Sequence, residues 1–435
     1  MKTSKTHSDT ERRQTIVVVG GGFGGLNFIK KIDRKRFDVV LVDKNNFNSF
    51  PPLFYQVASA GLDGGSISFA LRREMRSRKA RGCRYHMGEV KTIDTVRHEL
   101  HTQYETIHYD KLVLAPGTTN NFFGMTDLAD RVHTLKSVSE ALRCRNDILE
   151  RLERAAVSHD ADFRRRILTF TIVGGGPAGV EIAGALGEMK RYILRREYPN
   201  IDPDEVTVTL VEGTDRLLRT MSPQASRRVL EYMKSLMVNV KLQTTMKSYG
   251  DDCMVTFSDG ERIYSEMVIW TAGVTGVPFE FTGPAPEMAH GGRLQVDEYN
   301  RVQGVDDVFA VGDLAYHADD AWPHGLPQVA QVAIQGARTL AYNLNKGQFI
   351  RPFKYHDKGT MATVGRNRAV ADLHNVHLYG RPAWFTWMAV HLITLLGMRN
   401  RITVFITWVW AYFTYSSSLR LILRPTRHPR RDRWD

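Results

Sequence analysis

Short apolar runs that alternate with helical segments recur along this chain. The run Ile16–Val19 is followed by the helical pattern Leu26–Ile32 and by the predicted strand Phe37–Val42. The same order returns later, where an apolar run precedes the predicted helix Val180–Tyr198 and the strand Val206–Val211. Strands that alternate with helices are typical of α/β proteins with parallel sheets. Because the order occurs twice, we expect a duplicated α/β fold.

A glycine-rich turn with the spacing G-x-G-x-x-G follows the first strand of each copy. The glycines are Gly20, Gly22 and Gly25 in the first copy and Gly174, Gly176 and Gly179 in the second. In this motif the first glycine permits a tight turn, the second lets a pyrophosphate approach the backbone, and the third lets the helix pack close to the strand. The phosphates then meet free N–H groups at the helix N-terminus. The pattern therefore predicts two Rossmann-type dinucleotide-binding domains.

An acidic residue closes the second strand of each copy. Asp43 comes 18 residues after Gly25, whereas Glu212 comes 33 residues after Gly179 because a long helix and loop intervene. A carboxylate at this place accepts hydrogen bonds from ribose hydroxyls. Glu212 also favours NADH, since a 2′-phosphate would meet a like charge, although two nearby arginines keep some use of NADPH open. These arginines are Arg216 and Arg219.

Later glycine-containing turns extend the duplication. A strand ending at Leu114 runs into the turn Ala115–Thr118. The similar segment Met267–Gly276 follows an alternating β-meander with an Asp-Gly hairpin signal. We therefore expect Gly117 and Gly273 to belong to the two cofactor sites.

A glutamine-bearing helix is predicted over Leu326–Asn345. Its glutamines would share one helix face, and they are Gln328, Gln331 and Gln335. Apolar residues occupy the rest of the segment, which favours a largely buried helix with partnered amides over a solvent-facing stripe. Before this helix, the apolar strand Asp307–Leu314 ends in Gly312 and Asp313.

Length and charge limit the classes of protein to be considered. With 435 residues, of which 43% are hydrophobic and 24% charged, the chain is long enough for two or three globular domains. The formal net charge of +12 indicates an anionic partner surface or simply a basic enzyme. The basic run in Ala70–Arg84 is interpreted as a solvated face. The polar segment Met1–Arg13 has no apolar signal region, so we expect the catalytic body in the cytoplasm.

Cysteine usage argues against several activities. The three cysteines, Cys83, Cys144 and Cys253, lie far apart in the sequence. They form no C-x-x-C redox pair and no metal-ligand cluster, so we predict no metal site. We interpret them as small buried hydrophobic residues.

The C-terminal region changes character. Pro382–Met398 and Ile402–Leu419 carry no formal charge and are rich in aromatic residues, and an arginine-rich tail follows them. Seventeen apolar residues are the lower limit for crossing a bilayer. A membrane-inserted or interfacial helical pair with its arginines at an anionic surface fits this pattern best. The alternative is a hairpin that buries the same surface in a homodimer.

Four motifs resemble those of the type II NADH:quinone oxidoreductases, single-subunit FAD enzymes of the two-dinucleotide-binding-domain flavoproteins. The motifs are VVVGGGFGG at 17–25, GGGPAGVE at 174–181, AVGD at 310–313 and AQVAIQ at 330–335. The resemblance extends from about Thr15 to Leu423. It implies that the first Rossmann domain holds FAD and the second NADH. Asp313 would bind the flavin ribityl chain, and Gln331 and Gln335 would lie at the quinone site.

The resemblance also gives Glu181 a role, as a nicotinamide-facing carboxylate that relays protons to quinone. The residues alone leave open a solvated carboxylate or one favoured by the helix dipole. The implied domains are 14–150 with 285–365 for FAD, 166–284 for NADH, and 366–435 for the membrane helices and tail.

The function expected from the resemblance is that of a non-proton-pumping respiratory NADH:quinone oxidoreductase. It would act on the cytoplasmic face of the inner membrane, with ubiquinone or menaquinone and without nucleic acid. The alternatives are a sulfide:quinone or ferredoxin-type reductase and a flavin-bearing redox-sensing protein. The absence of a suitable cysteine pair argues against disulfide and sulfide chemistry.

Overall fold

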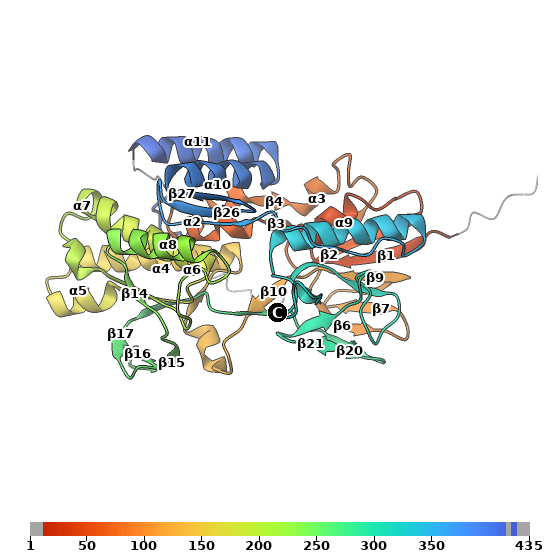
Figure 1. Cartoon of the computed structure of the whole chain (residues 1–435), viewed down its shortest axis with the longest axis horizontal. Helices are drawn as coiled ribbons and strands as arrows, with labels where there is room; N and C mark the ends of the chain where they lie inside the picture. The colour runs from red at the N-terminus through yellow and green to blue at the C-terminus, as the bar shows by residue number, and fades with distance from the viewer. Residues whose placement is uncertain (1–11, 415–418, 424–435) are drawn as a thin grey trace, which may run out of the picture. The chain divides into compact units, whose positions relative to one another are not determined.

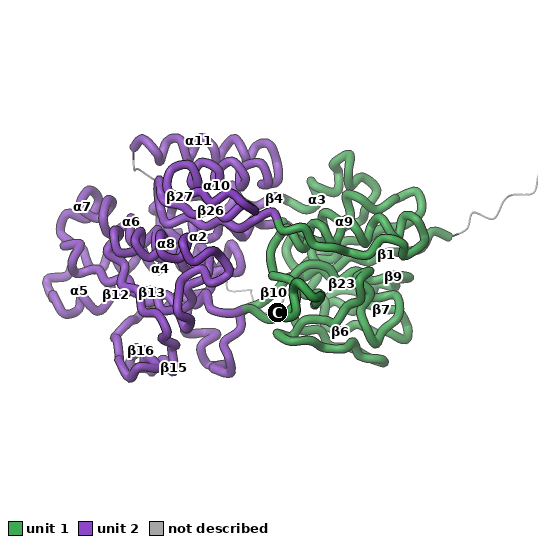
Figure 2. The backbone as a smooth tube through the Cα atoms, viewed as in Figure 1, with its two compact units in different colours: residues 1–48, 70–119, 274–357 green, residues 49–69, 120–273, 358–435 purple. Residues whose placement is uncertain are grey.

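The predicted duplication is confirmed, because the structure contains two five-stranded parallel sheets, one in each half of the duplication (Figure 1). The computed structural model describes residues 12–414 and 419–423. These residues form two compact units (Figure 2). Unit 1 consists of the described residues up to 48, of 70–119 and of 274–357. Unit 2 consists of 49–69, of 120–273 and of the described residues from 358 onward.

Unit 1 is built on a parallel sheet with the strand order β23-β9-β1-β2-β5. These strands are β1 (Gln14–Val19), β2 (Phe37–Asp43), β5 (Arg84–Met87), β9 (Lys111–Leu114) and β23 (Val308–Ala310). A four-stranded sheet lies beside it and consists of β6 (Val90–Asp94), β7 (Glu99–Thr102), β8 (Thr106–His108) and β20 (Glu280–Thr282). A smaller sheet contains β21 (Met288–Ala289), β22 (Arg293–Gln295) and β24 (Ala315–Tyr316).

The helices of unit 1 cover the other face of its parallel sheet, with α9 opposite the four-stranded sheet in Figure 1. They are α1 (Phe23–Ile29), α3 (Leu71–Glu74) and α9 (Ala330–Lys346). The four residues Ile16–Val19 of β1 are all buried, so both faces of this strand are covered. This is expected of a strand in a parallel sheet that is packed on two sides. Val17 and Val19 pack toward Ile93 and Leu100 of the four-stranded sheet.

Unit 2 repeats this plan with the strand order β11-β18-β12-β13-β14. These strands are β11 (His133–Thr134), β12 (Thr169–Val173), β13 (Thr207–Val211), β14 (Asn239–Lys241) and β18 (Met267–Trp270). The predicted meander is present as the antiparallel strands β15 (Met246–Tyr249), β16 (Met254–Phe257) and β17 (Arg262–Tyr264). A second antiparallel sheet contains β25 (Thr360–Thr363), β26 (Ala369–Leu373) and β27 (Val376–Tyr379).

Most of the described helices belong to unit 2. They are α2 (Phe54–Ala58), α4 (Val138–Val157), α5 (Ala161–Ile167), α6 (Pro177–Glu188), α7 (Leu194–Glu197), α8 (Pro223–Ser235), α10 (Arg381–Thr394) and α11 (Met398–Thr414). Two short strand pairs include residues at which the chain passes from one unit to the other. They are β3 (Phe47–Ser49) with β4 (Ser68–Ala70), and β10 (Thr118–Asn120) with β19 (Val274–Gly276).

Several predicted boundaries are wrong. The helix predicted over Val180–Tyr198 begins at Pro177, which fits the first helical turn, and a π turn at Met189–Ile193 interrupts it. The helix predicted over Leu26–Ile32 runs from Phe23 to Ile29 instead.

Two further boundaries near the end of unit 1 are wrong. The glutamine helix predicted from Leu326 begins at Ala330, so Gln328 lies before it. The strand predicted over Asp307–Leu314 ends at Ala310, and Gly312–Leu314 form a 3-10 turn instead.

The two uncharged C-terminal segments form α10 and α11, although part of the second segment and most of the arginine-rich tail lie outside the described residues. Both helices contribute to the interior of unit 2, since Ala383, Trp387 and Val404 are buried. In the part of the chain that the structure describes, no helix combines the length and apolar character needed to cross a membrane. The three predicted domains are functional regions, and their limits stay a prediction.

Candidate functional site

The glycine-rich turn between β1 and α1 has the geometry that its spacing predicts. Gly20 has a φ of +99°, and a Cβ there would collide with the backbone of Ala115. A Cβ at Gly25 would collide with the carbonyl oxygen of Gly20, so only glycine lets the helix pack this close. A Cβ at Gly22 meets no atom within 4 Å. The turn is therefore closed on itself but open at its second glycine, where a pyrophosphate would approach.

The turn between β12 and α6 repeats this arrangement. Gly174 has a φ of +111°, and a Cβ there would lie 2.7 Å from the amide nitrogen of Ala272. A Cβ at Gly179 would collide with the carbonyl oxygen of Gly174, whereas one at Gly176 meets no atom within 4 Å. Unit 2 therefore has its own open cradle.

The two predicted acids occupy the same place in their units. Asp43 Oδ2 accepts a hydrogen bond of 2.6 Å from the Gly21 amide, and Glu212 Oε2 accepts one of 2.6 Å from the Gly175 amide. The second oxygen of each carboxylate accepts from the amide two residues later, at Asn45 (2.7 Å) and Thr214 (2.8 Å). Burial raises the pKa of Asp43, while the backbone donors at Gly21 and Asn45 oppose that rise.

The other predicted cofactor residues of unit 1 come from neighbouring strand ends. Gly117 follows β9, has a φ of +80° and faces open space. Gly312 follows β23, has a φ of +77°, and would bring a Cβ within 2.9 Å of Ala333 on α9. The backbone oxygen of Asp313 accepts a hydrogen bond of 3.2 Å from Gln328. The carboxyl ends of β1, β9 and β23 thus gather these residues, as expected for a ligand site on a parallel sheet.

The helices differ in whether a side chain caps the N-terminus, and α2, α3, α7 and α10 have no such cap. Residues Ser137, Asp160 and Ser222 cap α4, α5 and α8 with side-chain hydrogen bonds. No side chain caps the N-termini of α1, α6 or α9. Their first N–H groups are available to an anionic or electron-rich ligand. With the open cradle at Gly22 and the carboxylate of Asp43, unit 1 fits an adenine dinucleotide such as FAD.

Gly273 of unit 2 follows β18, where Gly117 follows β9 in unit 1. It has a φ of +71°, and a Cβ there would collide with the ring of Phe123. Its carbonyl oxygen accepts a hydrogen bond of 3.4 Å from the Asn121 amide. This turn is therefore covered by protein, in contrast to the open turn at Gly117.

Glu181 is buried on α6, two residues after Gly179, so the solvated alternative is wrong. The pocket around its carboxyl group is formed by Tyr55 of α2, Thr363 of β25 and Trp387 of α10. Burial raises the pKa of Glu181 to about 8. The Thr363 backbone and the nearby indole N–H of Trp387 oppose this rise, although the indole does not reach normal hydrogen-bond geometry.

No local sequence pattern predicts that the members of this pocket meet. Tyr55 and Trp387 are both buried, their ring centroids lie 6.2 Å apart, and more than 300 residues separate them. Trp387 also stacks on His391 at 4.0 Å. The Nδ1–H of His391 donates to the Trp387 carbonyl oxygen at 2.7 Å, and burial lowers the pKa of His391 to about 4. A neutral histidine therefore lies next to the pocket.

Gln331 and Gln335 lie on α9 and are half-buried. Gln335 makes two hydrogen bonds with the backbone of His356, donating to its oxygen at 2.9 Å and accepting from its amide at 3.1 Å. Gln331 donates to Asp357 Oδ1 at 3.3 Å. The prediction that these amides have partners is confirmed, and both partners come from the segment that ends unit 1.

Comparison with known proteins supports the family resemblance of the four sequence motifs. Residues 14–337 match the family model described as pyridine nucleotide-disulphide oxidoreductase, and residues 357–415 match the model described as NDH2 C-terminal domain. A protein of Mycobacterium tuberculosis named type II NADH:quinone oxidoreductase Ndh is 34% identical over 426 residues, which cover 93% of this chain and 89% of that protein. This chain belongs to the type II NADH:quinone oxidoreductase family.

The relatives of this oxidoreductase also include solved structures. The structure of NDH2 from Plasmodium falciparum in complex with NADH has a TM-score of 0.86 at 21% identity, with coverage of 95% of this chain and all of that chain. The sulfide:quinone oxidoreductase of Aquifex aeolicus has a TM-score of 0.67 at 17% identity, with coverage of 93% and 96%. At such identities these two likenesses concern the fold alone. The thiols of Cys83 and Cys144 are buried and that of Cys253 is half-buried, and all three are free.

Proposed function

We propose that this chain oxidises NADH and reduces a membrane quinone, with FAD held by unit 1 and NADH by unit 2. FAD supplies the redox chemistry when bound, since it accepts a hydride and returns two electrons. The observation that carries this proposal is the matched pair of turns, each with an open second glycine and a carboxylate bonded to the turn. The names of the relatives fit the same reaction.

In this proposal the residues of unit 1 bind and orient FAD. The N–H groups of the open turn at Gly22 receive the pyrophosphate, and Asp43 accepts from the ribose hydroxyls. Gly117 leaves room for the cofactor, and Asp313 binds the ribityl chain. The uncapped N-terminus of α9 presents positive partial charge to the electron-rich edge of the ring system.

In unit 2, the turn at Gly174, Gly176 and Gly179 binds the pyrophosphate of NADH, and Glu212 accepts from its ribose. Gly273 completes the turn after β18. The carboxylate of Glu212 disfavours a 2′-phosphate by charge, so NADH is the expected donor and NADPH a poorer one.

Glu181 is proposed to hold a proton during quinone reduction. The overall reaction takes NADH, one proton and quinone to NAD⁺ and quinol, so one proton must come from outside the hydride. A carboxyl group with a pKa of about 8 is largely protonated at neutral pH and can exchange that proton with water. Gln331 and Gln335 are proposed to lie at the quinone site. Ubiquinone and menaquinone are both candidate acceptors.

An anaerobic mixing experiment tests the reaction. We expect the yellow colour of the purified protein to bleach within seconds of adding NADH, and more slowly with NADPH. The colour should return when a ubiquinone or menaquinone analogue is added. Bleaching without recovery by either quinone would contradict a quinone reductase and favour a redox-sensing flavoprotein.

Attachment to the cytoplasmic face of the inner membrane is proposed through the exposed faces of α10 and α11. These faces carry large exposed apolar side chains, including Ile393, Phe405, Ile406, Trp410 and Phe413. So much contiguous apolar surface is unusual on a soluble monomer. The alternative is a homodimer that buries this surface.

Point substitutions test the attachment better than truncation, because deleting α10 would remove Trp387 from the pocket of Glu181. We expect Phe405→Glu with Trp410→Glu to move the protein from the membrane fraction to the soluble one. NADH oxidation with a water-soluble quinone should remain within about twofold, since both side chains are exposed. Continued sedimentation with membranes, or a soluble parent dimer that becomes a monomer, would contradict membrane attachment.

A further inference from the structure

A basic surface in unit 1 has no place in the proposed chemistry. Between Leu71 and Gly88 the chain contains seven lysines and arginines and one acid, Glu74. Glu74 is buried and pairs with Lys30 at 2.9 Å, so it does not neutralise the run. The seven basic side chains are all exposed, and they are Arg72, Arg73, Arg76, Arg78, Lys79, Arg81 and Arg84. We call this set the basic surface.

Buried anchors hold this segment in one conformation. The side chains of Leu71, Met75, Ala80 and Cys83 are buried and alternate with the outward basic residues. Successive backbone hydrogen bonds form tight turns, including Ala80 N to Ser77 O at 3.0 Å and Cys83 N to Ala80 O at 3.1 Å. The charges are therefore displayed from an ordered scaffold, which lowers the entropic cost of binding a partner.

Few acids oppose this charge. Among the described residues, Arg76, Arg78 and Lys79 form no ion pair, and Arg72 lies over the ring of Tyr85 at 5.0 Å. The run ends at a cleft of about 430 Å³ lined by Arg13, Arg34, Lys35 and Arg81, with Asp33 and Asp38. Asp38 pairs with Arg13 at 2.7 Å, and Asp33 accepts from the Lys35 amide at 2.9 Å. The excess of positive charge thus continues into a hollow.

We propose that the basic surface binds the headgroups of anionic phospholipids and makes membrane attachment selective for them. It rests on the proposed function only in that a quinone reductase works at a bilayer. The basic segment directly follows β4 in the sequence. In unit 2, the Ser68 carbonyl of β4 accepts a hydrogen bond of 2.8 Å from Asn400 at the start of α11. Arg72 therefore follows the residue that contacts α11 by only four residues of chain.

The chemistry of the surface favours lipid over nucleic acid. Single-stranded nucleic acids bind through exposed aromatic side chains on which bases stack. Tyr85, which lies under Arg72, is buried and cannot serve in this way. Clusters of lysine and arginine beside a membrane element are typical of sites for anionic headgroups. The apolar side chains of α10 and α11 would then insert into the bilayer, and the basic surface would select anionic lipids.

The test is flotation with vesicles of phosphatidylcholine alone and of phosphatidylcholine with phosphatidylglycerol. The variant replaces Arg76, Arg78 and Lys79 with Gln. Each cation near an anionic surface contributes about fivefold to partitioning, so we expect about 100-fold weaker binding to the anionic vesicles. Binding to phosphatidylcholine alone should not change. High salt should reduce the difference between variant and parent.

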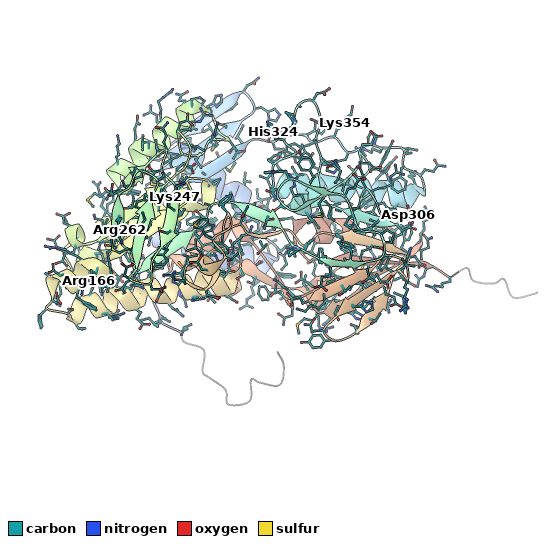
Figure 3. The ribbon with its side chains drawn as sticks, turned by 90° about the horizontal axis from the view of Figure 1, so that it is seen from below. Arg166, Lys247, Arg262, Asp306, His324 and Lys354 are labelled. Carbon is teal, nitrogen blue, oxygen red and sulfur yellow. The ribbon has the colours of Figure 1, made fainter. Side chains whose placement is uncertain are left out.

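A matched control removes the same charge elsewhere. Arg166, Lys247 and Lys354 are exposed and lie on α5, on β15 and before β25 (Figure 3). Replacing these three with Gln should leave binding to anionic vesicles within about twofold of the parent. An equal loss in the control variant would show a net-charge effect and overturn the proposal. Unchanged binding of the Arg76, Arg78 and Lys79 variant would overturn it as well.

Two further measurements separate the alternatives. Inorganic phosphate at constant ionic strength should not release the protein from vesicles, whereas release would indicate a site for free phosphate and contradict the lipid proposal. NADH oxidation with a water-soluble quinone, measured without vesicles, should be equal in parent and variants. Absence of that activity in the parent would contradict the proposed function and leave the lipid result standing.

Discussion

The turn between β1 and α1 in unit 1 and the turn between β12 and α6 in unit 2 are built differently in sequence. The carboxylate follows the last glycine by 18 residues in the first and by 33 in the second. In both, however, a carboxylate oxygen lies 2.6 Å from the amide after the first glycine. The number of residues between the last glycine and the carboxylate can vary, because the pairing of the two strands sets the position of the carboxylate. The longer spacing in unit 2 lengthens only the helix and loop between those strands.

The two turns differ in the side chain two residues after the last glycine. In unit 1 this residue is Asn27, which bonds to the Phe23 carbonyl at 2.9 Å and to Arg338 at 3.0 Å. In unit 2 it is Glu181, buried against Tyr55 and Trp387. Unit 2 therefore carries an ionisable group where unit 1 carries a neutral amide. In the proposed function, this difference separates a site that only holds a nucleotide from one that can also exchange a proton.

Substitution of the open glycines is expected to have the largest effect on cofactor binding. We expect Gly22→Val to give colourless protein, because its side chain would occupy the place of the FAD pyrophosphate. Gly176→Val should keep the flavin and raise KM for NADH by about 100-fold, equivalent to about 3 kcal/mol of binding. Both positions face open space, so the fold itself should tolerate the change. Absorbance at the flavin band and steady-state kinetics measure the two effects. A yellow Gly22→Val protein would show that the first turn is assigned to the wrong ligand.

Glu181→Gln places a neutral amide two residues after the last glycine of the second turn, as Asn27 does in the first. We expect quinone reduction to slow by about 100-fold, within the usual contribution of a general acid, while reduction by NADH changes little. Stopped-flow kinetics of the two half-reactions measure this. Glu188→Gln on the same helix is the control, because Glu188 is bound by the Arg366 amide and not by the Thr363 backbone. Equal slowing in both variants would indicate a structural effect of α6.

The same variant has a pH-dependent effect on stability. The pKa of Glu181 is raised from 4.5 to about 8, so the folded state disfavours its charged form. The contribution of Glu181 to the free energy of unfolding is therefore fully present below pH 4.5 and is lost as pH rises through about 8. We therefore expect the Tm of Glu181→Gln, relative to the parent, to increase by several degrees between these pH values. A constant difference in Tm would contradict the burial of an ionisable carboxyl group.

The local patterns in the sequence were sufficient for the turns and the carboxylates, since each depends on residues close together in the chain. They were insufficient for the start of α9, which begins at Ala330 because the preceding segment makes tertiary contacts, such as that of Gln328 with Asp313. They were also insufficient for the pocket of Glu181. Its members come from helices and strands far apart in sequence, and no periodicity reports such a meeting.

Replacing each of the two carboxylates with an amide tests which nucleotide each unit binds. We expect Glu212→Gln to raise the ratio of kcat/KM for NADPH to that for NADH about tenfold, since a negative charge near the 2′-phosphate is lost. Asp43→Asn should leave this ratio unchanged, because unit 1 is proposed to hold FAD. Steady-state kinetics with both nucleotides measure the ratio. An unchanged ratio in Glu212→Gln would show that another residue reads the ribose.

The smallest effects are expected on α9, which differs in its N-terminal cap from α4 of unit 2. The helix after β23 in unit 1 has no side-chain cap at Val329, whereas the helix after β11 in unit 2 has a complete capping box of Ser137 and Glu140. Gln335→Leu removes two hydrogen bonds to the backbone of His356, which is exposed so that water can replace them, and should lower the free energy of unfolding by about 1 kcal/mol. Gln331→Leu removes a single bond to Asp357 and should cost less stability.

The two glutamines also test the quinone site. If Gln331 contacts quinone, Gln331→Leu should slow flavin reoxidation by quinone several-fold and leave reduction by NADH nearly intact. Stopped-flow traces after each addition separate the two steps, and thermal unfolding detects any general damage. Gln335→Leu serves as the comparison, because its two backbone bonds give it a structural role whatever it binds. Equal slowing of both half-reactions in Gln331→Leu would mean that α9 supports the FAD site only, and that quinone is bound elsewhere.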